Sequence, residues 1–494
     1  LHAIASGIIR TMNQQKNRCK QRIKLTFTYA VMTLAVLALA VVCLMLVQGY
    51  RLDFDRGTVR QGGMMQFDSR PDGATIQIDA ATLANRTATR IVATAGQHTV
   101  TVSKDGFVPW QKQVNVKAGS ILWLNYVKLV PTSIETKDAM ELASLDSAAA
   151  APDKSRFAVI QNKQQPAVDF LKVDNDRIEH KQRVISADSY TADGANHSFA
   201  IESWSKDSKR VLISHSFDDS KEYLIVDLDG KAQNITRDIG VQISKLAFDK
   251  SDSQNVYVLT ADSDVRRIRL SDKTLSGPLI SDASDFYVSR NGWISYTTKP
   301  NNSGERTIGY LSKGASKPRA LQTFKDMAGR SLNLAIEEYY YDNFALITHG
   351  KMVAVKKVKL PASDSTDELQ QELLATLPLA TDVSYAGFSP NEHLYVYAQA
   401  GVSLVTYNLE LRSIANVSMK TTATSEIAWL DNSHIMRVSG GTFEFGDYDG
   451  TNMHTMATDA VGSAAMQSSN NRFLYYFRKQ ASGKITASYI KMYD

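Results

Sequence analysis

The chain has 494 residues, of which 43% are hydrophobic, 22% are charged and only two are cysteine, and its formal net charge is +5 at pH 7. The basic excess lies before residue 25, in a stretch without acidic residues, so the rest of the chain is nearly neutral and gives no support for a nucleic-acid-binding surface. Residues 48–494 contain no cysteine, which excludes a disulfide or a thiolate metal site there. A chain of this size can bury several cores, and we expect more than one domain.

The first predicted element is a membrane span of residues 25–47, which begins at Leu25, ends at Val47 and contains no charge, proline or glycine. At about 1.5 Å per residue, such a helix is roughly 34 Å long and can cross a hydrocarbon core of about 30 Å. Because lysine and arginine gather before it, we expect residues 1–24 to be a cytoplasmic tail and the rest to be extracytoplasmic. The predicted partner is therefore the lipid bilayer, and the predicted location is the membrane of a bacterial cell, crossed once.

Two alternatives to this span are a cleaved signal peptide and a lipoprotein anchor. A signal peptide has a shorter apolar core and a small-x-small cleavage site, which Val47-Gln48-Gly49-Tyr50 does not offer. A lipoprotein anchor at Cys43 would need a small residue before it, where the sequence has Val42. The sequence therefore favours an uncleaved span.

After a juxtamembrane linker of residues 48–62, residues 63–131 are predicted to form a small all-β domain. Five segments alternate apolar and polar residues or are rich in β-branched residues; they are residues 64–69, 74–79, 97–104, 110–117 and 121–130. The run Ser69-Arg70-Pro71-Asp72-Gly73-Ala74 indicates a turn, because proline fixes φ and Asp-Gly supplies a positive φ. Lys104-Asp105-Gly106-Phe107 is a second turn.

These turns and strands resemble the PEGA domain, which is named for a Pro-Glu-Gly-Ala motif. The motif residues are Ser69, Pro71, Asp72, Gly73, Ala74, Gly96, Gly106 and Trp110. Two departures are Asp72 in place of glutamate and the absence, around residues 87–90, of the Thr-Pro pair usual in the middle of the domain. The resemblance implies a β-sandwich found on envelope proteins, without catalytic residues, in which the motif residues serve turn geometry and core packing.

A longer repeat follows residue 131: an apolar or aromatic residue, two further residues, a polar marker and then an alternating apolar strand. The eight markers are Asp153, Asp207, Ser251, Asn291, Asn343, Asn391, Asn432 and Asn470. They are roughly 40 to 50 residues apart, which is typical of propeller blades. We therefore predict a mainly β chain in which residues 132–494 form a β-propeller, with eight blades favoured and seven as the alternative.

Each marker is expected to cap a tight turn between the first two strands of a blade, while the preceding aromatic residue packs between blades. These aromatic residues include Trp204, Phe248, Phe388 and Trp429. The repeat resembles TolB-like and WD40-like propellers, most clearly in Trp204-Ser205-Lys206-Asp207 and Phe388-Ser389-Pro390-Asn391. This resemblance implies a fold and no particular activity. Asp-Gly hairpins near Gly230 and Gly450 lack the spacing of a calcium loop.

The end of the chain predicts how the propeller closes. After Asn470 only two strands fit, residues 472–478 and 484–493, which leaves the last blade without an edge strand. An unpaired edge exposes backbone donors and acceptors. Residues 132–137 are therefore expected to supply the missing strand from the other end of the domain.

Two segments depart from the strand pattern. Residues 365–377 begin with Ser-Thr-Asp-Glu and place Leu369, Leu373 and Leu377 on one face of a helix, which predicts a short surface helix. The run Tyr339-Tyr340-Tyr341 is either part of the packing between blades, which is favoured, or a platform for stacking a sugar.

The sequence predicts no catalytic, metal or cofactor residues. Histidines do not form H-x-x-x-H, and G-x-S-x-G, Walker and dinucleotide motifs are absent. Asp218-Asp219 and Glu337-Glu338 are adjacent pairs, which on a strand face opposite ways, and are interpreted as solvated turns.

Two functions remain. The favoured one is a non-enzymatic envelope protein whose propeller binds an unknown envelope protein or glycan. The alternative is a propeller enzyme acting on extracellular polysaccharide, for which carboxylates should converge in the central channel.

Overall fold

The computed structural model describes residues 24–45, 50–53, 58–325, 329–391, 393–419 and 426–494. By their internal contacts these residues divide into two compact units, Leu1–Leu129 and Val130–Asp494. Both units are built mainly from β-strands, as the sequence predicts.

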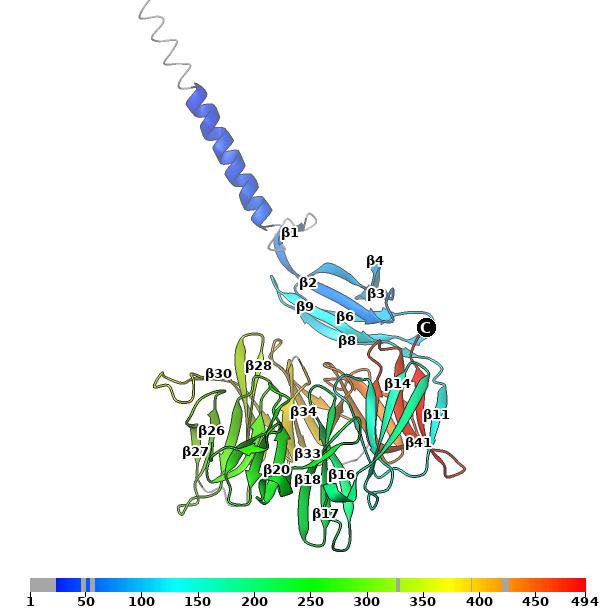
Figure 1. Cartoon of the computed structure of the whole chain (residues 1–494). Helices are drawn as coiled ribbons and strands as arrows, with labels where there is room; N and C mark the ends of the chain where they lie inside the picture. Colours follow the sequence, from blue (N-terminus) through cyan, green and yellow to red (C-terminus); the bar gives the residue numbers. More distant parts are fainter. Residues whose placement is uncertain (1–23, 46–49, 54–57, 326–328, 392, 420–425) are drawn as a thin grey trace, which may run out of the picture. The chain divides into compact units, whose positions relative to one another are not determined.

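The first described element is a helix from Lys24 to Met45, 22 residues long and apolar enough to cross a membrane (Figure 1). Its large apolar side chains are exposed, and the hydroxyl of Thr33 donates to the Tyr29 carbonyl at 2.8 Å, so this polar group is satisfied within the helix. The predicted span of residues 25–47 is thus helical over most of its length. Residues 46–47 of the predicted span and residues 1–23 of the predicted tail of residues 1–24 lie outside the described residues, and Lys24 begins the helix.

The first unit continues as two four-stranded sheets (Figure 1). One sheet contains β1 (Tyr50–Asp53), β2 (Thr58–Arg70), β5 (Thr89–Thr94) and β9 (Ile121–Lys128). The other, in spatial order, contains β4 (Ala81–Arg86), β3 (Thr75–Ile78), β6 (Gly96–Ser103) and β8 (Trp110–Val116). Strand β2 is central, because it pairs antiparallel with β1 and β5 and parallel with β9.

Alternating side chains from both sheets form the core of this unit. Strand β8 buries every second residue, beginning with Trp110, whose ring meets that of Tyr126 edge-on at 6.2 Å. Met65 and Phe67 of β2 are also buried. The five predicted strands are all present, whereas β1, β4 and β5 of these two sheets were not predicted. The predicted linker of residues 48–62 is wrong where it is described, because β1 and the first residues of β2 pair there as strands. Nearly every residue of β4 is exposed, so it has no apolar alternation to detect.

The second unit is a β-propeller. Its described residues form eight four-stranded antiparallel sheets, seven of which use four consecutive strands (Figure 1). The first three sheets are β12 (Ser147–Ala150), β13 (Arg156–Ile160), β14 (Ala167–Asp174), β15 (Arg177–Val184); β16 (Ser198–Trp204), β17 (Arg210–Phe217), β18 (Ser220–Asp227), β19 (Ala232–Asn234); and β20 (Ile243–Phe248), β21 (Asn255–Thr260), β22 (Val265–Arg269), β23 (Thr274–Leu275).

The following sheets keep the same order of strands. They are β24 (Ala283–Val288), β25 (Ile294–Thr298), β26 (Arg306–Leu311), β27 (Arg319–Phe324); β28 (Leu332–Tyr339), β29 (Asp342–His349), β30 (Met352–Lys359), β31 (Gln370–Pro378); β32 (Tyr385–Phe388), β33 (Tyr395–Ala400), β34 (Ser403–Asn408), β35 (Ser413–Val417); and β36 (Ala428–Trp429), β37 (His434–Ser439), β38 (Thr442–Asp447), β39 (His454–Ala457). Short elements outside these sheets are β7 (Phe107–Val108), β10 (Val130–Pro131), the 3-10 helix η1 (Ala187–Ser189) and α2 (Ile235–Ile239).

The hydrophobic core of the propeller lies between neighbouring sheets. The middle strands have protein on both faces, and every residue of β33 is buried, which is why these strands read as continuous apolar runs. The fourth strand of the first sheet, β15, faces solvent and is almost entirely exposed. Phe170 of one sheet and Trp204 of the next share a cluster in which their rings are 5.9 Å apart.

The eighth sheet is completed from the other end of the propeller. It contains β40 (Ala460–Gln467), β41 (Phe473–Lys479), β42 (Ile485–Lys491) and β11 (Thr136–Leu142). Strand β11 pairs antiparallel with β42, from Thr136 opposite Ile490 to Leu142 opposite Ile485, and Figure 1 shows it in cyan against the red strands of the C-terminus. The predicted closure is confirmed, but the strand is Thr136–Leu142, so only its first two residues lie within the predicted residues 132–137.

The predicted helix of residues 365–377 is wrong, because residues from Gln370 onward form β31, the fourth strand of its sheet. A spacing of four residues fits one face of a helix and also one face of a strand, so the leucines did not distinguish the two. A bulge in β31 then separates them, leaving Leu373 59% exposed and Leu377 fully buried. Backbone pairing with β30 thus determines the structure of residues 370–378, although the Ser-Thr-Asp-Glu run before them resembles the start of a helix.

Candidate functional site

The PEGA-motif residues build the turn between β2 and β3. The buried Ser69 hydroxyl donates to the Pro71 carbonyl at 2.7 Å and lies 2.6 Å from the hydroxyl of Thr87. Thr87 Oγ1 also accepts from the Ala74 amide at 2.9 Å, and its carbonyl accepts from the Gly73 amide at 2.9 Å. The segment without the usual Thr-Pro pair thus still holds this turn, through Thr87.

The other motif residues have turn and packing positions. Gly73 and Gly106 have φ of +70° and +84°, which only glycine adopts readily, and Gly96 begins β6. Asp72 is exposed at the turn and Trp110 is 1% exposed in the core.

Four propeller markers accept hydrogen bonds from the backbone of the turn after the first strand of their sheet. The side-chain oxygen and the amide that donates to it are Asp153 and Ser155 at 3.0 Å, Asp207 and Lys209 at 3.2 Å, Asn291 and Trp293 at 3.4 Å, and Asn470 and Arg472 at 3.0 Å. Three of these turns contain a serine two residues before the marker, whose hydroxyl donates to the marker oxygen; these are Ser205, Ser289 and Ser468. The sequence contains this Ser-x-Asp/Asn signal, but the predicted repeat did not use it.

Other markers have different roles. Asn343 is not a turn residue, because β28 and β29 join in a two-residue hairpin and Asn343 lies within β29. Near Asn432 the backbone amides of the turn donate to Asp431, while Asn432 accepts from the side chain of Asn391 at 3.2 Å. In the third sheet Asp249 takes the capping position and accepts from the amide of Ser251 at 2.7 Å.

The aromatic residues of the repeat lie between sheets. Trp204 donates from Nε1 to the Ala149 carbonyl of the preceding sheet at 3.0 Å. Phe248 and Phe388 pack in clusters that each join two sheets, and Trp429 lies 6.3 Å from the ring of Tyr395 in the preceding sheet.

The run of three tyrosines does not pack as expected. Tyr339 is partly buried against a core cluster, but Tyr340 and Tyr341 form the tip of the β28–β29 hairpin and are 68% and 95% exposed. The favoured interpretation, packing between sheets, holds for Tyr339 alone.

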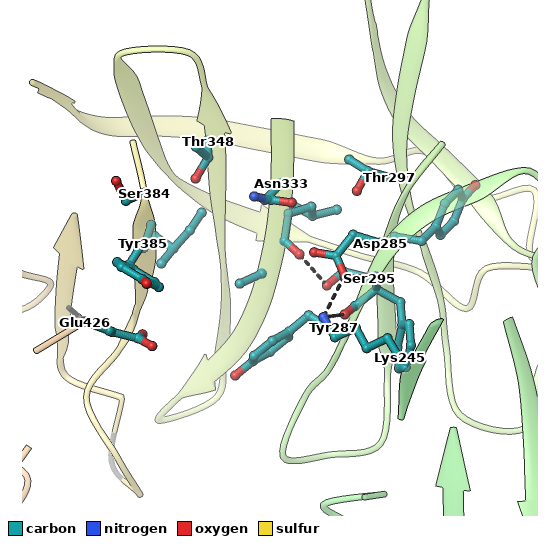
Figure 2. Close-up of a pocket in the computed structure, with 16 residues that line it drawn as sticks. Lys245, Asp285, Tyr287, Ser295, Thr297, Asn333, Thr348, Ser384, Tyr385 and Glu426 are labelled. Carbon is teal, nitrogen blue, oxygen red and sulfur yellow. Dashed lines mark hydrogen bonds and ion pairs between the residues drawn. The ribbon is translucent and has the colours of Figure 1, made fainter. Parts of the chain in front are cut away.

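A polar cavity of about 170 Å³ lies within the propeller. Its lining comes from the first strands β20, β24, β28 and β32 of four successive sheets, from the second strands β25 and β29, and from Glu426, which precedes β36. Figure 2 shows polar side chains around it, contributed by Lys245, Asp285, Ser295, Thr297, Asn333, Thr348, Ser384, Tyr385 and Glu426. The first strands of propeller sheets surround the central channel, so Lys245, Asp285, Asn333 and Tyr385 place one side of the cavity beside the channel.

Part of this polar lining is already paired. The Lys245 ammonium lies 2.6 Å from Asp285 Oδ1 and donates to the Phe286 carbonyl at 2.8 Å. The Tyr397 hydroxyl donates to Glu426 Oε1, and burial, together with the charge of Glu426, raises the pKa of Tyr397.

Other groups face the cavity without a partner. Within the described part of the chain, the side-chain hydroxyls of Thr297, Thr348, Ser384 and Tyr385 make no hydrogen bond. A cavity wall of free hydroxyls, with an aromatic ring at Tyr385, suits a ligand that itself carries many hydroxyls.

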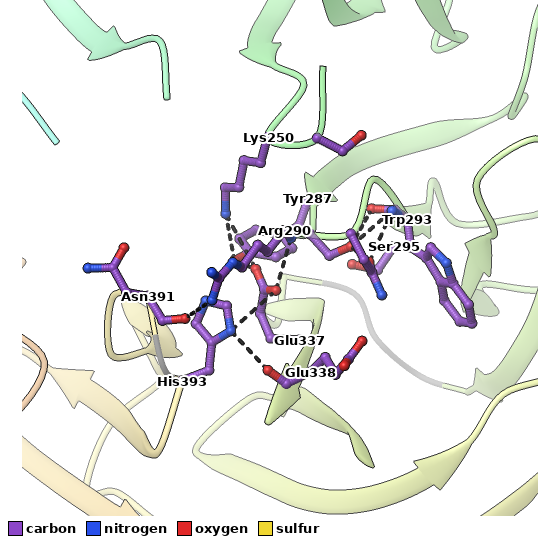
Figure 3. Close-up of polar contacts among 12 residues, drawn as sticks. Lys250, Tyr287, Arg290, Trp293, Ser295, Glu337, Glu338, Asn391 and His393 are labelled. Atoms are coloured by element: carbon purple, nitrogen blue, oxygen red, sulfur yellow. Dashed lines mark hydrogen bonds and ion pairs between the residues drawn. The ribbon is translucent and has the colours of Figure 1, made fainter. Parts of the chain in front are cut away.

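A charged network borders this cavity, because Tyr287 belongs to both (Figures 2 and 3). The Tyr287 hydroxyl donates to Glu337 Oε1 at 2.6 Å and accepts from the Lys250 ammonium at 2.8 Å. Glu337 Oε2 accepts from the Arg290 amide at 3.0 Å and lies 3.6 Å from His393 Nδ1.

Glu337 is the centre of this network. The interpretation of the pair Glu337-Glu338 as a solvated turn is therefore wrong. It lies in β28 and is 1% exposed, whereas its neighbour Glu338 is exposed, as adjacent residues of a strand should differ. The pair Asp218-Asp219, by contrast, lies in the turn between β17 and β18. Apolar periodicity marks strands but cannot reveal which polar residue has partners on other sheets.

Burial shifts the ionisation of the groups around Glu337. It raises the pKa of Tyr287 well above its usual value of 10, and the Glu337 charge adds to this effect. Burial lowers the pKa of His393, although the negative charge of Glu337 acts in the opposite direction. Although the Lys250 side chain is 42% exposed, the surrounding protein lowers its pKa, and the nearby charge of Lys206 lowers it further.

Comparisons with known proteins agree with this organisation in part. Residues 63–132 match the family model described as the PEGA domain. No curated protein matches the chain. Among solved structures, the chain is similar to the crystal structure of the Myceliophteria thermophila Cps50 (Swd1) beta-propeller domain, with 10% identity and a TM-score of 0.40 over 72% of this chain and 98% of that chain. This chain thus combines an apolar N-terminal helix, a region similar to the PEGA domain and a β-propeller.

Proposed function

We propose that this chain is a single-pass membrane protein of the bacterial cell envelope whose extracytoplasmic propeller is a non-catalytic module that binds a glycan. The observation that carries the proposal is the cavity within the propeller, where unpaired hydroxyls from different sheets face one space. Hydrogen bonds to sugar hydroxyls and stacking on Tyr385 are the contacts such a cavity can supply.

The anchoring part of the proposal has separate support. The helix from Lys24 to Met45 is long and apolar enough to cross a bilayer. Lysine and arginine gather before it, which favours a cytoplasmic amino terminus. The PEGA-like region between helix and propeller fits a domain held near the membrane. The Ser-x-Asp/Asn turns support a TolB-like or WD40-like character for the propeller.

Binding of oligosaccharides to the full-length protein in nanodiscs tests the proposal. We expect a panel of envelope-type oligosaccharides to contain a ligand whose affinity falls at least about tenfold in the double variant Asn333→Ala/Tyr385→Ala. The matched control is Tyr341→Ala, which removes an exposed tyrosine of the same unit outside the cavity. If only the control variant loses binding, the ligand site is the hairpin tip. If no oligosaccharide binds and a protein is captured instead, the module is a protein scaffold.

The enzyme alternative has one specific observation in its favour, because two carboxylates, Asp285 and Glu426, line the same cavity. A pair of carboxylates facing a sugar is the arrangement that glycoside hydrolysis needs. Incubation of the bound oligosaccharide with the protein separates the two functions. Cleavage that disappears in Asp285→Asn or Glu426→Gln would establish an enzyme, whereas binding of an intact ligand supports the module.

A further inference from the structure

Three successive sheets place a cation at the same position of the turn that follows their first strand. Lys206, Lys250 and Arg290 each lie two residues after the last residue of β16, β20 and β24. Equivalent turns of a propeller surround one mouth of the channel. The three cations therefore form an arc along part of that mouth.

Only part of this positive charge is neutralised by the protein. Glu337 forms an ion pair with the Lys250 ammonium at 3.5 Å. It also accepts a hydrogen bond from the backbone amide of Arg290, whereas the Arg290 guanidinium does not donate to it. The Arg290 guanidinium donates through Nη1 to the Asn391 carbonyl, which carries no net charge (Figure 3). The Lys206 side chain is exposed and makes no hydrogen bond or ion pair within the described part of the chain.

The acids of the same turns are directed into their own turns. Asp207 accepts from the Ser205 hydroxyl at 2.6 Å, and Asp249 accepts from the amide and hydroxyl of Ser251 at 2.7 Å. His393 also lies next to Glu337, with its Nδ1 3.6 Å from that carboxylate. Among the residues that the structure describes, the mouth thus presents the Lys206 ammonium and the Arg290 guanidinium without a carboxylate in contact with either.

The arc of cations adjoins the cavity through Tyr287. The Lys250 ammonium lies 4.2 Å from the centre of the Tyr287 ring and donates to its hydroxyl, and Tyr287 lines the cavity. A ligand that occupies the cavity and extends toward these turns would bring its next group to the cations. A guanidinium with free N–H groups beside ammonium groups suits a carboxylate or phosphate.

We propose that the glycan is acidic, with its uncharged part in the cavity and a carboxylate or phosphate held by Lys206, Lys250 and Arg290. This inference rests on the proposed glycan-binding function and adds the chemical class of the ligand. It requires that affinity for an acidic oligosaccharide exceed that for a neutral one of equal length.

The test measures binding of oligogalacturonate, a phosphorylated oligosaccharide and neutral maltohexaose to the full-length protein in nanodiscs. The variants are Lys206→Gln and Arg290→Gln, which leave the ion pair of Lys250 and Glu337 in place. The control is Lys231→Gln, which removes an exposed cation from the outer turn of the same sheet as Lys206. We expect affinity for one of the acidic ligands to fall about tenfold in each variant and not in the control, with a steep dependence on salt.

The outcomes separate this inference from the function on which it rests. Loss of binding by the uronate alone identifies a carboxylate ligand, and loss by the phosphorylated sugar alone identifies a phosphate; either supports the inference. Equal binding of maltohexaose, unchanged in both variants but weakened by Asn333→Ala/Tyr385→Ala, would overturn the acidic ligand and keep the glycan module. If inorganic phosphate competes with no ligand and salt has no effect, the inference is also overturned. Absence of all saccharide binding would overturn both proposals.

Discussion

Individual side chains in the second sheet of the propeller form a buried polar chain that resembles no predicted motif. His215 is fully buried, with Nδ1 2.8 Å from Glu222 Oε1 and Nε2 2.9 Å from His197 Nδ1. Glu222 Oε2 also accepts from Asn234 at 2.8 Å and from the Thr191 hydroxyl at 2.9 Å. Burial raises the pKa of Glu222, but these hydrogen bonds outweigh burial and bring the pKa to about 2.

Because this folded pKa lies below the unfolded value of about 4.3, Glu222 stabilises the fold above that value and loses its contribution as pH falls toward 2. We expect Glu222→Gln to lower the free energy of unfolding by about 1–3 kcal/mol at pH 7 and to weaken its decline between pH 5 and pH 3. Urea denaturation of the full-length protein at pH 7, pH 5 and pH 3 measures the free energy of unfolding of the variant and of the unmodified protein. Glu202→Gln, which removes an exposed ion pair with Lys221, should cost under about 1 kcal/mol. Equal acid sensitivity of Glu222→Gln and the unmodified protein would contradict the prediction.

At the scale of single residues, the sequence predicted local geometry better than partners. Gly73 and Asp207 could be placed in turns because their roles depend on neighbours in the chain. Glu337 could not be identified, because its contacts come from Tyr287, Arg290 and His393 on other sheets. The same limit applies to the cavity, whose lining comes from four sheets.

Among the elements, the closing strand β11 is held by a pair of charges as well as by its backbone. Asp138 meets the Arg478 guanidinium through two contacts of 2.7 and 2.8 Å and accepts from the hydroxyls of Thr486 and Ser488. The Arg478 hydrogen bonds hold the pKa of Asp138 well below its usual range.

We expect Asp138→Asn to reduce the free energy of unfolding by about 1–2 kcal/mol, a moderate loss because the carboxylate is one-third exposed. The depressed folded pKa means that this contribution is present above about pH 4 and is lost as pH falls below that value. Chemical denaturation of the full chain measures the loss. Glu141→Gln is the matched control on the same strand, because its ion pair with Lys484 is exposed on both sides and should matter little. A loss in the control as large as in Asp138→Asn would contradict a specific role for Asp138.

A glycine inside β26 allows close packing with a neighbouring strand. A Cβ on Gly309 would lie 2.5 Å from the Tyr296 hydroxyl and 2.4 Å from the Arg319 carbonyl oxygen. We therefore expect Gly309→Ala to lower stability by about 1–3 kcal/mol, through displacement of Tyr296 or of β27. Thermal denaturation followed by tyrosine fluorescence measures the change. Gly277→Ala is the control, because nothing lies within 4 Å of its added methyl group, and a similar loss there would exclude steric crowding as the cause.

The prediction of helices and strands failed where a sequence pattern fits two kinds of secondary structure or where no pattern is present. The leucines of residues 365–377 fit a helix, yet pairing with β30 makes the segment a strand. Exposed β4 has no apolar alternation. The repeat and the closing strand could be predicted because each depends on the whole length of the domain and not on one local window.

For the whole molecule, the proposed membrane topology rests on the lysine and arginine residues before the helix. We expect protease added to intact spheroplasts to degrade the propeller and to leave a protected fragment that ends near residue 48. Immunoblotting with antibodies to both ends measures this. Lysis with detergent before proteolysis is the control and should remove the protected fragment. Protection of the carboxy-terminal half in intact spheroplasts would contradict the predicted orientation.

The closing sheet also has a consequence for the order of synthesis. Asp138 and Ser488, which meet across β11 and β42, are 350 residues apart in the chain. During translation β11 is synthesised early and remains unpaired until β42 has been synthesised. Contacts between residues so far apart in the chain form slowly. A chain shortened by a premature stop or by cleavage would keep β11 as an open edge, ready to pair with other chains. Completion of the fold therefore depends on completion of synthesis, and quality-control proteases could recognise unfinished copies by that edge.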